Sequence, residues 1–161
     1  MIELKAPNKT RLRGPSVFLG GTIDMGNSED WQKFIVESLT KLDWDGIIYN
    51  PRRDDWDSSW EQTLENKNFA EQLSWENDHQ KLAGLNVYYF APGSKSPITL
   101  MELGEFGKYE TSFEDRPNDV VVCCPEGYWR KGNVDFFCMK YQIRQVASLD
   151  LLALCINGHR F

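Results

Sequence analysis

Short apolar runs alternate with helix-length segments along this chain, and this alternation constrains its fold more than any other feature. Four runs have the pattern of buried strands, at residues 16–19, 46–50, 86–90 and 119–124. The last run is almost continuously apolar, as a strand covered on both faces requires. Strands that alternate with helices of this length form a parallel sheet with right-handed crossovers. The sequence therefore predicts a three-layer α/β domain whose parallel sheet has about five strands.

Helical periodicity fills the segments between these runs. Apolar residues recur at helical spacing over residues 31–42, with Asn27 or Ser28 as the candidate cap. Ser96 and Pro97 predict another helix start, because serine is a favoured N-cap and proline costs little at the first helical position. Three further segments have helical periodicity: residues 66–83, 133–140 and 149–156.

The composition predicts one cytoplasmic globular domain over residues 1–161, in which the polar residues 1–14 form a loosely held lead-in. Hydrophobic residues make up 41% and charged residues 26% of the 161 residues. The formal net charge of −6 disfavours nucleic-acid binding, because an acidic domain repels the phosphate backbone. No apolar run approaches the roughly 20 residues of a membrane span, and the first residues lack a signal-peptide pattern. The four cysteines have no metal-binding spacing, so we expect reduced core thiols and no metal site.

Ligands of parallel α/β sheets bind beyond the carboxyl ends of the strands. The segments predicted to meet there are residues 20–22, 50–53 and 93–102. Gly20, Gly21 and Thr22 would let backbone groups approach a ligand, although an ordinary tight turn needs the same residues. Their spacing matches neither a dinucleotide fingerprint nor a P-loop. Arg52 and Arg53 offer guanidinium groups to an anion or to hydroxyl groups, or form a salt-bridged loop with the aspartates that follow them.

Two acidic residues interrupt apolar helix faces and are the catalytic candidates. Glu102 shares a predicted face with Ile98 and Phe106, so it should point toward packed structure. Glu76 interrupts a similar stripe on the preceding helix. Two inward-facing acids suit glycosidic chemistry. The alternative for Glu102 is a purely structural role, and the alternative for Glu76 is a position at the boundary of the buried face. His79 is interpreted as a surface or packing residue, because no zinc motif or serine–histidine arrangement accompanies it.

Five motifs follow one another along the chain, and together they span about residues 16–146. They are residues 17–23, 50–56, 72–76, 96–104 and 132–134. The most specific is the Ser-Pro-Ile-x-Leu-x-Glu-Leu-Gly element of residues 96–104. In this order the motifs resemble the nucleoside 2-deoxyribosyltransferase superfamily, and in particular its nucleoside 2-deoxyribosyltransferase-like branch.

The resemblance implies a Rossmann-like, flavodoxin-like sheet and a homo-oligomer in which a neighbouring subunit completes each active site. It implies a retaining, two-step exchange of the base of a 2′-deoxynucleoside with a free base, without metal or organic cofactor. Glu102 matches the nucleophile that attacks C1′ of the sugar, and Glu76 matches the acid that contacts the base. Asn133 matches a polar residue donated across the subunit interface. The other substrate-binding positions are Phe18, Gly20, Gly21, Thr22, Asn50, Arg52, Arg53 and Ser96.

The chain departs from the family pattern at three positions. Phe18 stands where the family often has tyrosine, so a hydroxyl that orients the nucleophile would have to come from Tyr88 or Tyr89. Ser96 stands where relatives that act on free deoxynucleosides can have aspartate. Gly84 also stands where aspartate is usual.

Two other functions remain as alternatives. An N-glycoside hydrolase of nucleosides or nucleotides would use the same intermediate with water as the acceptor. A nucleotide substrate would need clustered cations, for which the candidates are Arg52, Arg53, Arg130 and Lys131. A non-catalytic sensor of a nucleoside-derived ligand is the third possibility, and the two intact acids argue against it.

Overall fold

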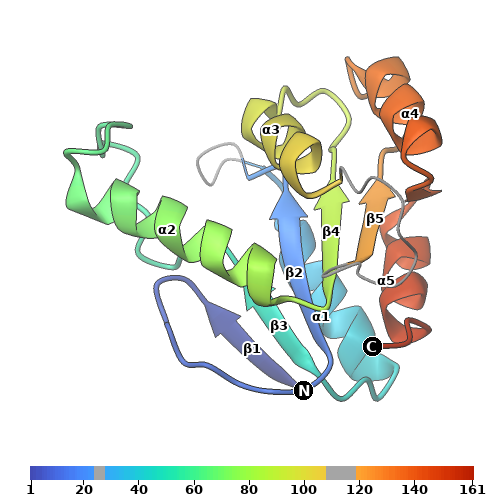
Figure 1. Ribbon diagram of the computed structural model, residues 1–161, viewed down its shortest axis with the longest axis horizontal. Helices are drawn as coiled ribbons and strands as arrows, with labels where there is room; N and C mark the ends of the chain where they lie inside the picture. Colours follow the sequence, from blue (N-terminus) through green and yellow to red (C-terminus); the bar gives the residue numbers. More distant parts are fainter. Residues whose placement is uncertain (24–27, 108–118) are drawn as a thin grey trace.

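The computed structural model describes residues 1–23, 28–107 and 119–161. In these residues six parallel strands form one sheet in the order β1-β3-β2-β4-β5-β6 (Figure 1). The strands are β1 (Ile2–Lys5), β2 (Ser16–Gly21), β3 (Ile47–Asn50), β4 (Leu85–Tyr89), β5 (Asp119–Cys123) and β6 (Arg144–Val146). The helices are α1 (Trp31–Lys41), α2 (Lys67–Leu82), α3 (Pro97–Phe106), α4 (Lys131–Lys140) and α5 (Leu149–Asn157).

The strand order confirms the predicted α/β class and identifies the fold as flavodoxin-like. From β2 to β6 the chain follows the doubly wound order of that fold, and β1 adds a strand beside β3. The chain moves outward from β2 to β3 in one direction, and then returns to β4 on the other side of β2. The direction of winding therefore reverses between β2 and β4, which is where ligands of such sheets bind.

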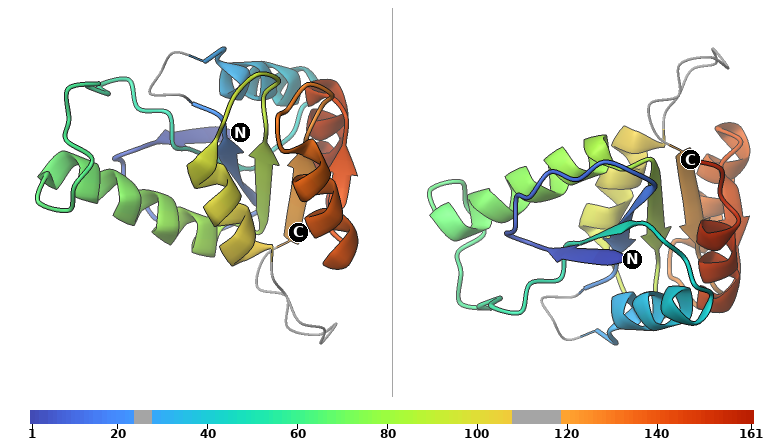
Figure 2. Two further views of the ribbon diagram at one scale, coloured as in Figure 1. Left: turned by 90° about the horizontal axis from the view of Figure 1, so that it is seen from above. Right: turned by 90° about the horizontal axis from the view of Figure 1, so that it is seen from below.

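Two layers of helices cover the sheet (Figure 2). On one face α1 and α5 pack against alternate strand residues, with Trp31, Leu39 and Leu152 among the buried side chains. On the other face α3 and α4 bury Leu103 and Val134 against β4 and β5. The third helix on that face, α2, packs toward β2 and β3. Both faces of the central strands are thus buried, which explains their continuous apolar runs.

The sheet has six strands where about five were predicted, because both edge strands have weak sequence patterns. The polar lead-in predicted for residues 1–14 contains β1, which pairs in parallel with β3 from Ile2 opposite Ile47 to Lys5 opposite Asn50. Leu4 anchors this strand in the core. At the other edge, β6 pairs with β5 although its three residues include an arginine and a glutamine. An edge strand needs little apolar sequence because only part of it is covered.

The helix starts differ in part from those predicted. Asp30 caps α1 by accepting a hydrogen bond from the Lys33 backbone N–H at 3.0 Å, so the prediction of a Ser28 cap is wrong. The alternative cap, Asn27, lies outside the described residues. Ser96 does stand immediately before α3, with proline at the first helical position, but its side chain forms no capping hydrogen bond. Its hydroxyl is used elsewhere, as described below.

In the described part of the chain no helix is long and apolar enough to cross a membrane. The same residues contain no group of three or more side chains placed to hold a metal ion. All four cysteines are buried and unpaired. Burial raises the pKa of the Cys123 thiol to about 12, so this side chain behaves as an apolar core group.

Candidate active site

Two acidic side chains, Glu76 on α2 and Glu102 on α3, lie near one another on the sheet face that α2, α3 and α4 cover. Both are half-buried. Glu76 Oε1 accepts a hydrogen bond of 2.8 Å from Gln72 Nε2, and Glu102 Oε1 accepts one of 2.9 Å from Gln80 Nε2. Gln72, Glu76 and Gln80 follow at intervals of four residues and therefore share one face of α2. This helix thus supplies one acid and a hydrogen-bond donor to each acid.

A buried tyrosine extends this arrangement into the sheet. The hydroxyl of Tyr88, on β4, donates a hydrogen bond of 2.6 Å to Gln80 Oε1. The Gln80 amide then donates to Glu102, so the Tyr88 hydroxyl reaches Glu102 through one intervening side chain. Tyr89, the other tyrosine considered, lies on the opposite face of β4, where its ring centroid is 5.2 Å from that of Trp31. Glu102 is therefore linked to the sheet by Tyr88 and not by Tyr89.

Burial changes the protonation of the two carboxyl groups. It raises the pKa of Glu76 from its ordinary value to about 7, and the bond from Gln72 opposes this shift. Burial, together with the charge of Glu76, raises the pKa of Glu102 to about 8, and the bond from Gln80 again acts in the opposite direction. The two groups titrate as a pair, since ionising one makes ionisation of the other less favourable. Near neutral pH the pair therefore retains a proton, so the site contains a protonated carboxyl group beside an ionised one.

Gly20 and Gly21 allow β2 to pack closely against β4. A Cβ atom at Gly20 would lie 2.8 Å from the ring of Tyr88. A Cβ atom at Gly21 would lie 2.6 Å from the carbonyl oxygen of Tyr89. These close contacts explain why neither position has room for a side chain. Contact of the two glycines with a substrate stays a prediction.

Thr22 directly follows β2 and lies in the wall of a cavity. The cavity has a volume of about 550 Å³ beyond the carboxyl ends of β2 and β4, and its lining includes Ser28, Tyr89 and Ser94. The Thr22 hydroxyl accepts a 3.0 Å hydrogen bond from the Ala91 backbone N–H and lies 3.1 Å from the Ser94 hydroxyl. Glu76 and Glu102 do not line this cavity. Of the three segments predicted to meet at a crevice, residues 20–22 and 93–102 contribute Thr22, Gly93 and Ser94 to this cavity, and residues 50–53 do not line it.

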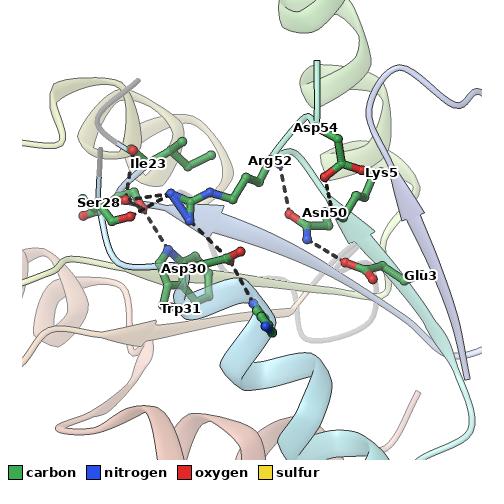
Figure 3. Close-up of polar contacts among 11 residues, drawn as sticks. Glu3, Lys5, Ile23, Ser28, Asp30, Trp31, Asn50, Arg52 and Asp54 are labelled. Atoms are coloured by element: carbon green, nitrogen blue, oxygen red, sulfur yellow. Dashed lines mark hydrogen bonds and ion pairs between the residues drawn. The ribbon is translucent and has the colours of Figure 1, made fainter. Parts of the chain in front are cut away.

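Asn50 and Arg52 form local networks (Figure 3). Asn50 donates to Glu3 at 2.7 Å and accepts from the Arg52 backbone N–H at 3.0 Å. The Arg52 side chain donates to the Ser28 carbonyl at 2.9 Å, and it also pairs with Asp30 at 3.3 Å.

Arg53 is buried and makes two 2.8 Å hydrogen bonds to the carboxylate of Asp55. Its guanidinium also lies over the ring of Trp60. Arg53 therefore forms the salt-bridged loop with a following aspartate that was one of the two alternatives, whereas Arg52 pairs with Asp30 at the start of α1.

Three further predicted binding residues differ in their surroundings. Phe18 is fully buried, and its ring centroid is 6.3 Å from that of Trp75. Ser96 is buried, and its hydroxyl lies 2.5 Å from that of Thr22. Asn133 is exposed on α4. The direct contact of these residues with a substrate stays a prediction.

The faces of α2 and α3 differ from those predicted. On α2 the buried residues are Gln72, Trp75, His79 and Gln80, so the polar amides lie inward. On α3 Glu102 is half-buried, but Ile98, which was predicted to share its face, is exposed. Apolar residues therefore also lie on the outer surface of this helix. His79 is the packing residue that was predicted, stacked on Trp75 with 4.0 Å between ring centroids. The amide donors were not recognised as site residues, although their four-residue spacing from Glu76 was a usable signal.

Comparison with known families gives one match. The model of a family described as "Nucleoside 2-deoxyribosyltransferase like" matches residues 14–128, which is more than half of the chain. The matched segment includes both acids and ends before Asn133. No match was found among curated proteins.

Proposed function

The chain belongs to the nucleoside 2-deoxyribosyltransferase-like family, and on this basis we propose that it exchanges the base of a 2′-deoxynucleoside through a deoxyribosyl ester on Glu102. The observation that carries the proposal is the pair of half-buried carboxyl groups on α2 and α3, each with an amide donor. A retaining exchange needs one ionised carboxylate as nucleophile and one proton for the departing base. A pair that retains a proton near neutral pH contains both groups. Because the pKa of Glu102, about 8, lies above that of Glu76, about 7, the proposed reaction requires the proton to pass from Glu102 to Glu76 when the substrate binds.

The first half of the reaction forms the ester. A carboxylate oxygen of Glu102 attacks C1′, and the electron pair of the C1′–N bond leaves with the base. The proton held by the pair passes to the base nitrogen, with Glu76 as the donor. In the second half the nitrogen of an entering base attacks C1′ from the other side. The ester bond breaks, Glu102 regains its charge, and Glu76 accepts the proton of the entering base.

The charges of the structure favour a nucleoside over a nucleotide. A 5′-phosphate needs cations that are not already neutralised. Arg52 pairs with Asp30, and Arg53 pairs with Asp55. Lys131 makes two 2.9 Å hydrogen bonds to Asp135, and Arg130 lies over the ring of Trp129. Three of the four cations considered for a phosphate therefore pair with a carboxylate, whereas Arg130 contacts an aromatic ring.

A homo-oligomer with shared active sites is part of the proposal. Its support is a set of exposed apolar side chains on α3, on α4 and in the segment before α4, here called the α3–α4 patch. The patch consists of the exposed side chains Ile98, Met101, Trp129, Phe136 and Met139. Exposed groups of this kind on adjacent elements are typical of protein interfaces. Asn133 lies exposed on the same helix as Phe136, so a neighbouring subunit at this patch would receive it.

A panel of 2′-deoxynucleosides, incubated with and without an acceptor base, tests the proposal. Chromatography should show a new deoxynucleoside only when the acceptor is present. Release of the base with no new nucleoside would indicate the hydrolase, and binding without turnover would indicate the sensor. The E102Q variant should be inactive in every arm, which excludes a contaminating activity.

A further inference from the structure

The buried polar chain from Tyr88 through Gln80 to Glu102 has a fixed direction of donation. The Tyr88 hydroxyl donates to Gln80 Oε1 at 2.6 Å, and Gln80 Nε2 donates to Glu102 Oε1 at 2.9 Å. Tyr88 is fully buried and Gln80 is 2% exposed, so water does not substitute for either contact. From this geometry, and resting on the proposed function, we infer that Gln80 and Tyr88 are positioning residues that hold Glu102 Oε1 and leave Oε2 as the attacking oxygen.

The amide of Gln80 matters because its two ends have opposite effects on a carboxylate. Its N–H end stabilises the ionised form, whereas its carbonyl end would repel that form and favour the protonated one. Tyr88 selects between these orientations. If the amide turned around, the hydroxyl proton of Tyr88 would lose its acceptor in a fully buried site, which is costly. The tyrosine hydroxyl therefore keeps the donor end toward Glu102.

The anchors of this chain are rigid. Tyr88 lies on the central strand β4, and the absence of a side chain at Gly20 makes room for its ring. The backbone oxygen of Gln80 accepts a 3.1 Å hydrogen bond from Asn86 Nδ2, and Asn86 is itself fully buried on β4. Gln80 is thus held to β4 at its backbone and at its side chain. A carboxylate bound to such a support keeps one orientation during the attack.

This arrangement also assigns the atoms of the ester. When Oε2 bonds to C1′, Oε1 becomes the carbonyl oxygen of the ester and keeps the hydrogen bond from Gln80. When the entering base displaces Oε2, the negative charge returns to both oxygens and the same N–H stabilises it. Gln80 therefore holds the group in the same place before and after each half-reaction.

The Y88F variant tests the inference, with Y49F, at a buried tyrosine of β3, as the matched control. We expect Y88F to lower kcat by about 10- to 100-fold with little change in KM, because a misplaced nucleophile slows the attack and leaves binding intact. Y49F should keep the wild-type kcat. The double variant Y88F/Q80L should be no slower than Q80L alone, since Tyr88 acts only through Gln80. Independent, multiplicative losses would overturn the inference.

A second measurement does not depend on turnover. NMR titration of ¹³C-labelled glutamate carboxyls, assigned with E102Q, reports the pKa of Glu102 directly. The groups that face Glu102 are Glu76 from α2, Glu105 from its own helix and Tyr88 from β4. Y88F should raise the pKa of Glu102 while Y49F leaves it unchanged, and an unchanged value in Y88F would refute the positioning role.

The two measurements separate the inference from the function on which it rests. If the wild-type protein exchanges no base, the proposed function fails, whereas the titration still decides whether Tyr88 acts on Glu102. Should Y88F not fold, Q80L gives the same readout, because loss of its N–H donor should also raise the pKa of Glu102. No shift in a folded Q80L protein would then overturn the inference.

Discussion

The hydroxyl groups of Thr22 and Ser96 lie 2.5 Å apart in the interior and join the end of β2 to the start of α3. Ser94 completes the group, with its hydroxyl 3.1 Å from that of Thr22 and 2.9 Å from that of Ser96. All three side chains are buried. Because α3 carries Glu102, this contact fixes the position of the helix of the proposed nucleophile relative to the end of β2.

Replacing Thr22 with valine should destabilise the fold. The variant keeps the shape of the side chain but removes the acceptor of the Ala91 N–H and the partner of two serine hydroxyls. Buried polar groups without partners cost about 1–3 kcal/mol in the free energy of unfolding. Urea denaturation measures this loss. The exposed Ser74→Ala substitution on α2 is the control and should change stability by less than about 0.5 kcal/mol.

Ser96 allows a test of backbone strain at the same place. Its backbone is left-handed, with φ of 43° and ψ of 53°, a conformation that glycine adopts at lower cost than serine or alanine. S96A loses the hydroxyl and keeps the strain, whereas S96G loses both. We therefore expect S96G to unfold at a higher urea concentration than S96A. The reverse order would show that this conformation stores no strain.

The central strands could be predicted from the sequence because both of their faces are buried. β2, β3, β4 and β5 each gave a short apolar run, and their alternation with helices was enough to predict a parallel sheet. The edge strands gave no such run. In β1 only Leu4 is buried, and β6 has no buried residue. Pairing at an edge depends on backbone hydrogen bonds, which a pattern of side chains does not report.

The acid pair could be predicted in part, because an acid within an apolar stripe is conspicuous. The glutamines around it were not predicted as hydrogen-bond donors to the acids, because hydrophobic periodicity reports which face is buried and not which polar groups pair there. Gln72 and Gln80 are buried because their amides bind the carboxyl groups, so tertiary contacts decide the orientation of α2. Arg52 and Arg53 show a further limit. The sequence offered both an anion site and a salt-bridged loop, and only three-dimensional contacts distinguish them.

The acid pair should make the fold less stable as the pH rises. Burial raises the pKa of Glu76 to about 7 and that of Glu102 to about 8, from an ordinary value of 4.5. Between these limits the folded protein binds more protons than the unfolded chain, so the free energy of unfolding falls with increasing pH. The contribution of the pair is fully present below pH 4.5 and is lost as the pH passes through 8.

Urea denaturation between pH 5 and pH 9 measures this dependence. Each of the substitutions E76Q and E102Q should flatten the curve, by at most about 1.4 kcal/mol per pH unit. E37Q, which changes an exposed acid on α1, should leave the slope unchanged. If the free energy of unfolding of both variants still fell with pH as steeply as that of the wild type, other groups would cause the dependence.

The α3–α4 patch should hold the proposed oligomer together. Placing a charge there with F136E should produce a smaller species in sedimentation equilibrium, because a buried unpaired charge opposes association. F34E, on α1 at the other face of the sheet, is the matched control and should keep the wild-type mass. A wild-type protein that is monomeric and fully active would exclude shared active sites.

Mixing two inactive variants tests the sharing of sites directly. E102Q lacks the nucleophile and N133A lacks the residue donated to the neighbour. In a two-fold dimer, each mixed pair contains one intact site, so random exchange should restore about a quarter of the wild-type activity. Activity that stays at the level of the separate variants would place Asn133 outside the neighbour's site.

The last prediction concerns the identity of the nucleophile. E102Q and E102A should lose several orders of magnitude in kcat, since the covalent route is removed. Both variants should remain folded, because the substitution also removes a carboxyl group whose ionisation is unfavourable in the folded state. E76Q should have a milder defect that depends on the leaving base, because Glu76 protonates the base and does not bond to the sugar. A purely structural Glu102 would give the opposite result, with reduced stability and unchanged turnover per folded molecule.

Mass spectrometry after reaction with a slow 2′-fluoro nucleoside identifies the modified residue independently. A label on any residue other than Glu102 would disprove the assignment.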